Sequence, residues 1–110
     1  MKANFHTHSV YSDGADTLTE LVEAAIEKGF GALGFSEHSY TYFDESYCMS
    51  RENTPRYFSE VRALQEKYRG RIALYLGIEQ DFYSTESVDN YEYVIGSVHY
   101  LKKGGHFLPV

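Results

Sequence analysis

The sequence predicts an α/β fold of mainly parallel strands joined by crossover helices. Amphipathic helical segments alternate along the chain with short apolar segments of strand length, and helices that link strands in this way give right-handed crossovers and a parallel sheet. The composition, 43% hydrophobic and 16% aromatic, is that of a globular protein with a buried core. A length of 110 residues fits one domain and is too short for two.

The chain begins with a predicted strand followed by the clearest predicted helix. Residues 3–5 are a short apolar run of strand type. The helix is expected over residues 16–29, where Thr17 and Glu20 have the spacing of a capping box and Gly29 can end the helix in the left-handed conformation. Apolar residues recur along it at helical spacing, at Leu18, Leu21, Val22, Ala25 and Ile26.

A second strand, over residues 32–35, leads through a long loop to a second helix over residues 55–69. Thr54 is expected as its N-cap, Pro55 as its first residue and Gly70 as the residue that ends it. Its apolar stripe consists of Tyr57, Val61, Leu64 and Tyr68.

Two further apolar runs, residues 72–78 and 93–95, predict the third and fourth strands. The two helices between the strands make the sheet parallel, and parallel strands of an α/β fold direct their carboxyl ends toward one edge. Ligands of such folds bind at that edge. The residues that follow each strand are therefore the candidates for function.

Each predicted strand ends in a side chain that can bind a metal ion. The first strand leads to His6 and His8, the second to His38, the third to Glu79 and the fourth to His99. His6 and His8 are two residues apart, so both imidazoles leave an extended chain on the same face and can reach one cation.

A further carboxylate, Asp13, lies in a Ser-Asp-Gly turn that can fold back over the same edge. Every one of these residues also has a purely structural explanation, such as turn formation for Asp13 or a salt bridge for Glu79. Their convergence on one edge of the sheet favours a shared metal site. Glu37 is expected to point to the opposite face from His38 and to support the site.

Histidines and carboxylates without a thiolate suit a catalytic site for Zn²⁺, Mn²⁺ or Fe²⁺ better than a closed structural zinc site. In such a site Glu79 could bridge two ions while a metal-bound hydroxide attacks the phosphorus of a phosphate ester. The ions would then supply the positive charge that a chain of formal charge −6 lacks. Arg51 and Arg56 are the local candidates for contact with the phosphate, although solvated loop charges are the simpler explanation of both.

The remaining observations limit partners and location. The net charge of −6 and the lack of a basic field argue against nucleic acid as a partner. The single cysteine, Cys48, permits no internal disulfide, which fits a reducing cytoplasm. The sequence contains no signal-peptide pattern and no apolar run long enough to cross a membrane, so we expect a cytoplasmic protein. Three tyrosines of the long loop, Tyr40, Tyr42 and Tyr47, are candidates for substrate contact, although packing of the core and rim is their simpler explanation.

Four motifs, in order along the chain, resemble those of the polymerase and histidinol phosphatase (PHP) superfamily. They are His-Thr-His-Ser-Val-Tyr-Ser-Asp-Gly at residues 6–14, Phe-Ser-Glu-His at 35–38, Gly-Ile-Glu at 77–79 and Gly-Ser-Val-His at 96–99. The residues of these motifs are most similar to those of the histidinol-phosphatase branch of the superfamily. The resemblance spans residues 1–101 and implies part of a distorted (β/α)₇ TIM-like barrel. It also implies a trinuclear metal site that hydrolyses L-histidinol phosphate to L-histidinol and phosphate in histidine biosynthesis.

Position by position, the resemblance implies that His6 and His8 bind one metal ion and that His99 binds a second. Glu79 would bridge these two ions. The third ion would be bound by the two remaining candidates, namely Asp13 and His38.

The family's barrel continues well beyond this length and supplies further ligands and phosphate-binding residues. We therefore expect residues 1–110 to be a truncated, N-terminal part of a single barrel domain that lacks part of the site. The open sheet edges of such a half-barrel would be covered by a partner, for example a second copy. Two other functions stay open: a non-catalytic metal-binding or assembly module, and a PHP exonuclease domain that acts on DNA.

Overall fold

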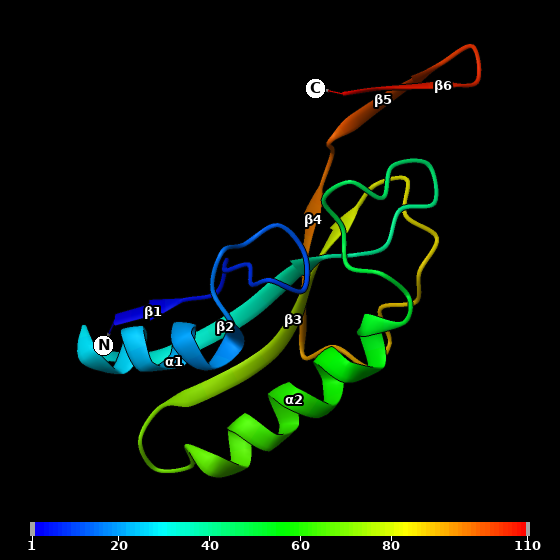
Figure 1. Ribbon diagram of the computed structural model, residues 1–110. Helices are drawn as coiled ribbons and strands as arrows, with labels where there is room; N and C mark the ends of the chain where they lie inside the picture. The colour runs from blue at the N-terminus through cyan, green and yellow to red at the C-terminus, as the bar shows by residue number, and fades with distance from the viewer. Residues whose placement is uncertain (1, 110) are drawn as a thin grey trace.

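The computed structural model describes residues 2–109, and its central element is a four-stranded parallel sheet in the order β1-β2-β3-β4 (Figure 1). The predicted α/β fold with parallel strands and crossover helices is confirmed. Strands β2 and β3 pair without interruption from Ala32 opposite Ala73 to His38 opposite Glu79. The strands are β1 (Lys2–Asn4), β2 (Phe30–His38), β3 (Ala73–Asp81) and β4 (Tyr93–Ser97).

Helix α1 (Leu18–Glu27) lies within the predicted range and begins with the predicted capping box. The Thr17 hydroxyl accepts a hydrogen bond from the Glu20 amide, and the Glu20 carboxylate accepts one from the Thr17 amide. These two bonds satisfy backbone N–H groups that have no partner within the helix. Gly29 has a φ of 80°, as expected for the residue that ends the helix.

Helix α2 (Asn53–Lys67) begins before the predicted position, and the expectation that Thr54 is its N-cap was wrong. The hydroxyl of Ser50 accepts a hydrogen bond from the Asn53 amide, and the Ser50 carbonyl accepts one from Thr54. Ser50, three residues before the helix begins, therefore accepts hydrogen bonds from the first two backbone amides of α2. Pro55 becomes the third helical residue, which costs nothing because the N–H groups of the first turn have no intrahelical acceptor.

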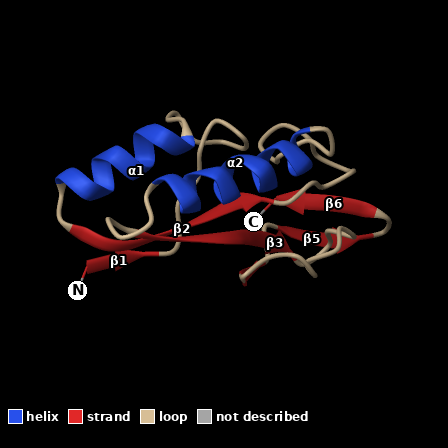
Figure 2. Cartoon of the chain, turned by 90° about the horizontal axis from the view of Figure 1, so that it is seen from below, coloured by secondary structure: helices blue, strands red, loops and turns tan. Residues whose placement is uncertain are grey.

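Both helices cover the same face of the sheet, and the hydrophobic core lies between them and the strands (Figure 2). Side chains alternate along each strand, so every second residue of β2 and β3 enters this core. The largest apolar side chains buried there are Tyr57, Tyr68, Phe35, Leu18, Met49, Leu76 and Ile78.

The opposite face of the sheet is held together by Tyr93 of β4. Its ring lies where a side chain at Gly34 or Gly77 would otherwise be. Its hydroxyl lies 2.7 Å from the carbonyl oxygen of Phe5 and 2.9 Å from that of Phe35. The Tyr93 side chain of β4 thus contacts β2, β3 and the residue that follows β1.

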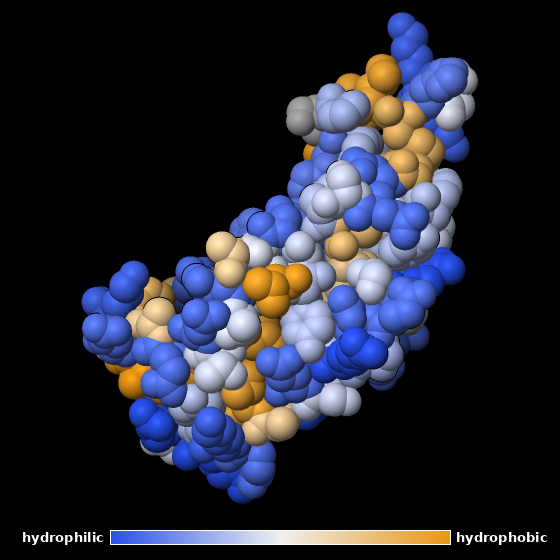
Figure 3. Space-filling model, viewed as in Figure 1, coloured by the Kyte–Doolittle hydropathy of each residue, from blue (hydrophilic) through white to orange (hydrophobic). Residues whose placement is uncertain are grey.

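A hairpin that the sequence analysis did not predict projects beyond the sheet (Figure 1). Its strands are β5 (Tyr100–Lys103) and β6 (His106–Pro109). Gly104 and Gly105 connect them with φ values of 58° and 81°, the left-handed conformations that a tight two-residue turn requires. Apolar side chains gather on this projecting end of the molecule (Figure 3), where Leu101 and Leu108 are exposed.

The four-stranded sheet is open, with β1 and β4 at its edges. An open parallel sheet with two free edges is the arrangement expected of half a barrel. Within residues 2–109, no helix is both long and apolar enough to cross a membrane.

Because Gly77 lies beneath Tyr93, the substitution Gly77→Ala is expected to destabilise the protein. The added methyl group would lie 2.2 Å from the Tyr93 ring and 2.7 Å from the Phe35 carbonyl oxygen, and overpacking of this kind costs about 1–3 kcal/mol. Gly96→Ala is the matched control, since its methyl group would meet no atom within 4 Å. Urea unfolding of both variants tests the difference, and equal midpoints would contradict it.

Candidate metal centre

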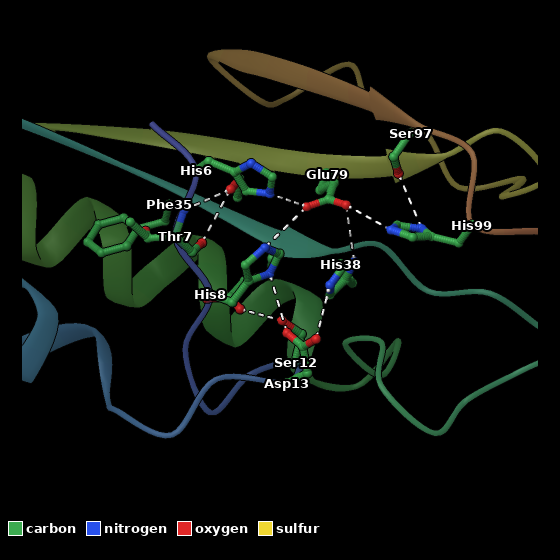
Figure 4. Close-up of polar contacts among 12 residues, drawn as sticks. His6, Thr7, His8, Ser12, Asp13, Phe35, His38, Glu79, Ser97 and His99 are labelled. Atoms are coloured by element: carbon green, nitrogen blue, oxygen red, sulfur yellow. Dashed lines mark hydrogen bonds and ion pairs between the residues drawn. The ribbon is translucent and has the colours of Figure 1, made fainter. Parts of the chain in front are cut away.

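The structure brings six candidate residues together at the carboxyl ends of the four parallel strands (Figure 4). Two of them follow β1, one lies in the loop before α1, one ends β2, one lies within β3 and one follows β4. In chain order they are His6, His8, Asp13, His38, Glu79 and His99.

His6 and His8 lie beyond the end of β1, in a segment that remains attached to β2. Thr7, between them, accepts a hydrogen bond from the Ser36 amide, and its own hydroxyl donates to the Gly34 carbonyl. These bonds keep the segment extended, so both flanking imidazoles point toward Glu79 (Figure 4).

The centre of the cluster is the buried carboxylate of Glu79. Its Oε1 atom lies 2.6 Å from Nε2 of His6 and 3.1 Å from Nε2 of His8. Its Oε2 atom lies 3.1 Å from Nε2 of His99 and 3.6 Å from Nδ1 of His38. Each oxygen of this carboxylate therefore faces two imidazoles.

Asp13 closes the cluster on the solvent side. Its Oδ1 atom lies 3.5 Å from Nδ1 of His8, and its Oδ2 atom lies 3.2 Å from Nε2 of His38. Since the other ring nitrogens of His8 and His38 face Glu79, each of these imidazoles lies between two carboxylates.

The donor atoms form three overlapping groups that could each hold a metal ion. Within each group all donor atoms lie within 4.8 Å of one another. The groups are His6, His8 and Glu79; His8, Asp13 and His38; and His38, Glu79 and His99.

Several observations fit divalent metal ions at this cluster. Ligand atoms of one tetrahedral zinc ion lie about 3.3 Å apart, and most contacts of Glu79 and Asp13 with the imidazoles are 3.1–3.6 Å long. The Nδ1 atom of His8 is buried without a hydrogen-bond partner. Within the described chain, neither carboxylate forms an ion pair with a lysine or arginine.

The electrostatics of the cluster also favour metal binding. Burial lowers the pKa of His38 below its ordinary value, and the attraction of Glu79 opposes this shift without cancelling it. Burial alone would raise the pKa of Glu79, but the neighbouring imidazoles of His38, His6 and His8 hold it below its ordinary value. At neutral pH the carboxylate is therefore ionised and His38 is mainly neutral, the forms that coordinate metal ions.

Asp81 is a functional candidate that the sequence analysis missed. It is buried and accepts a hydrogen bond from the His99 amide at 3.1 Å, and the same oxygen lies 3.3 Å from Nδ1 of His99. A carboxylate on the far nitrogen of a histidine orients its ring and increases its basicity. The signal was the spacing of two from Glu79, which places both carboxylates on one face of β3.

The other side chains proposed from the sequence lie outside the cluster. Arg51 forms an ion pair with Glu86 at 3.1 Å, and Arg56 is exposed on α2. Within the described chain neither forms an ion pair with a residue of the cluster. Their role in phosphate contact stays a prediction. Of the three tyrosine candidates, Tyr47 borders the cluster, with its ring centroid 4.8 Å from that of His38.

The fold and the motifs define a family, and the PHP domain model matches residues 4–109. The chain therefore belongs to the PHP domain family. It is 33% identical over 115 residues to a probable histidinol-phosphatase of Deinococcus radiodurans, and that match covers 94% of this chain and 44% of the relative. It is also 27% identical to the DNA polymerase/3'-5' exonuclease PolX of Bacillus subtilis, covering 90% of this chain and 18% of PolX.

A solved structure shares the fold. The histidinol phosphate phosphatase of Lactococcus lactis, crystallised with zinc, L-histidinol and phosphate, aligns with a TM-score of 0.77 and 27% identity. The alignment covers 94% of this chain and 41% of that one. The chain spans less than half the length of the histidinol phosphatases that it matches, and its sheet corresponds to part of their TIM-like barrel.

Burial and the charge of Glu79 act on the pKa of His38 in opposite directions. The effect of removing the Glu79 charge can therefore be predicted. In metal-free protein, maintained with a chelator, Glu79→Gln is expected to lower the pKa of His38 further, because Glu79 stabilises the charged imidazole. NMR titration of the His38 ring measures this shift. Glu86→Gln, which changes a carboxylate paired with Arg51, is expected to leave it unchanged. An unchanged or raised pKa in Glu79→Gln would contradict the expectation.

Proposed function

We propose that this chain is the N-terminal part of a metal-dependent phosphatase that hydrolyses L-histidinol phosphate to L-histidinol and phosphate. The observation that supports it most is the set of three donor groups that overlap at His8, His38 and Glu79. The similarity to histidinol phosphatases over 94% of the chain supports the choice of substrate.

In this proposal the cluster binds two or three divalent metal ions. His6 and His8 hold the first ion, Glu79 bridges it to the second, and His99 binds the second. The remaining carboxylate and imidazole of the cluster, Asp13 and His38, hold the third. Zinc is supported by its presence in the Lactococcus lactis phosphatase, and the same donors also suit manganese and iron.

Bound at this cluster, the ions would supply Lewis acidity and lower the pKa of a water nucleophile. The side chains of the chain hold the ions and set their spacing. Each oxygen of Glu79 faces a different pair of imidazoles, so this carboxylate can serve two ions at once. Asp13 is the most exposed of the cluster's carboxylates and borders an open hollow that also contains Tyr47 and Tyr100, where a phosphate ester could enter.

The ions would also balance the charge of the phosphate. Arg51 is already paired with Glu86, and the chain carries a formal charge of −6. A phosphate ester at this edge would therefore be attracted mainly by the metal ions. The same net charge argues against an exonuclease that holds DNA through its phosphates, although the similarity to PolX keeps that function as the second candidate.

The open sheet suggests how the molecule is completed. The edges β1 and β4 and the exposed apolar side chains Phe5, Tyr75 and Val94 require a cover. Further barrel strands or a second copy of the chain would provide one. A reducing cytoplasmic location fits the free thiol of Cys48.

Removal of a shared ligand tests the metal assignment. Glu79→Ala and His8→Ala are expected to lower the amount of bound metal more than they lower stability, because each residue belongs to two donor groups. Elemental analysis measures the metal, and urea unfolding of metal-free protein measures the stability. His106→Ala, on the exposed end of the hairpin, is the matched control. Unchanged metal content in both cluster variants would refute the assignment.

Turnover separates the candidate functions. Chain freed of metal by a chelator and reloaded with zinc or manganese is expected to release phosphate from L-histidinol phosphate only slowly, because it lacks part of the site, and to leave single-stranded DNA intact. Phosphate release and DNA length are both measured, with chelated protein as the control. Tight metal binding without phosphate release would favour a non-catalytic module. Shortening of the DNA would favour the exonuclease.

A further inference from the structure

Glu37 is a fully buried carboxylate that lies outside the three donor groups. It precedes His38 on β2 and, because side chains alternate along a strand, points to the opposite face of the sheet. Within residues 2–109 it forms no ion pair with a lysine or arginine. A buried carboxylate is costly unless hydrogen bonds satisfy it, so its partners indicate what it does.

Within residues 2–109, the Glu37 carboxylate accepts hydrogen bonds only from the loop that carries Asp13. The Ser9 amide donates to both carboxylate oxygens, at 2.9 and 3.1 Å. The Ser9 hydroxyl donates to Oε2 at 2.5 Å, and the Ser12 hydroxyl donates to Oε1 at 2.6 Å. Two hydroxyls and one amide thus converge on a single side chain.

Ser9, which donates to Glu37, is also the centre of the hydrogen bonds within the loop. The Ser9 carbonyl accepts hydrogen bonds from the amides of Ser12 and Gly14, and the Ser9 hydroxyl accepts one from Tyr11. Gly14 packs so closely on the backbone of His8 that an added methyl group would lie 2.2 Å from the His8 carbonyl oxygen. Movement of Ser9 would therefore move the segment between His8 and Asp13.

We infer that Glu37 is a positioning residue, which fixes the loop of residues 9–14 so that Asp13 faces His8 and His38. Strand β2 then serves the group of His8, Asp13 and His38 in two ways: His38 is a member of the group, and Glu37 anchors the loop that carries Asp13. The anchoring of the loop is independent of metal. Its effect on metal affinity rests on the proposed function.

The anchoring is tested first in metal-free protein by amide hydrogen exchange. Glu37→Gln keeps the shape of the side chain but replaces one acceptor oxygen with a donor. We expect the amides of residues 9–14 to exchange roughly tenfold faster in this variant, with helix α2 unchanged. Tyr57→Phe is the matched control, because Tyr57 is buried in the same core but donates to Gly77 rather than to the loop. Equal exchange in the loop of Glu37→Gln and of the unaltered protein would overturn the inference.

A second pair of variants covers the possibility that Glu37→Gln does not fold. Ser12→Ala removes one hydrogen bond to Glu37 and is expected to speed exchange in the loop by a smaller factor. Ser12→Thr retains a hydroxyl and is expected to restore slow exchange. Equal exchange in Ser12→Ala and Ser12→Thr would count against the anchoring role, since a general packing effect would not depend on the hydroxyl.

Zinc titration then tests whether Glu37 acts through Asp13. Glu37→Gln and Asp13→Asn are each expected to lower the affinity for one zinc ion by roughly 10- to 100-fold. The double variant should bind this ion no more weakly than Asp13→Asn alone. Additive losses, or equal weakening of every ion, would overturn the role through Asp13. Failure of the unaltered protein to bind zinc would refute the proposed function, while hydrogen exchange would still decide the anchoring of the loop.

Discussion

The parallel pairing of β2 with β3 is the constraint on which the rest of the molecule depends. It sets His38 opposite Glu79 at the carboxyl ends of two central strands, and β1 and β4 are then added on either side. A shift of one residue would turn Glu79 into the core and Ile78 toward the cluster. The apolar residues of β3 that pack under the helices therefore also fix the position of the central carboxylate.

Support for the cluster comes from the opposite face of the same strands as well as from neighbours within it. Glu37 enters the helix-covered core and holds the loop of Asp13, whereas Asp81 lies beside His99 on the same face as Glu79. Tyr93, on the same face as Glu79, donates to the carbonyl of Phe5, just before His6, and to that of Phe35 in β2. Residues without any donor in the three groups thus determine where the donors lie.

Much of the fold and the composition of the cluster could be predicted from the sequence. The alternation of helices and strands makes the sheet parallel, and a parallel sheet collects the strand ends, so His38, Glu79 and His99 could be placed at one edge without coordinates. The role of these residues as metal ligands stays a prediction.

The features that escaped prediction depend on contacts that no local pattern reveals. The Ser50 side chain caps the start of α2 at Asn53, where Thr54 and Pro55 had suggested a later start. Asp81 escaped notice because β3 was expected to end before it. Arg51 is paired with Glu86, 35 residues further along the chain. The hairpin is the exception, since the pair Gly104 and Gly105 is itself a local turn signal.

The placement of His8 and His38 between two carboxylates has a consequence for protons. A neutral imidazole carries one N–H, so it can donate to one carboxylate while its other nitrogen must face the second with a lone pair. A cation relieves that repulsion. Because burial keeps His38 mainly neutral at neutral pH, its lone pair is free to coordinate. An ion that binds between Asp13 and Glu79 would therefore meet this ring without first displacing a proton from it.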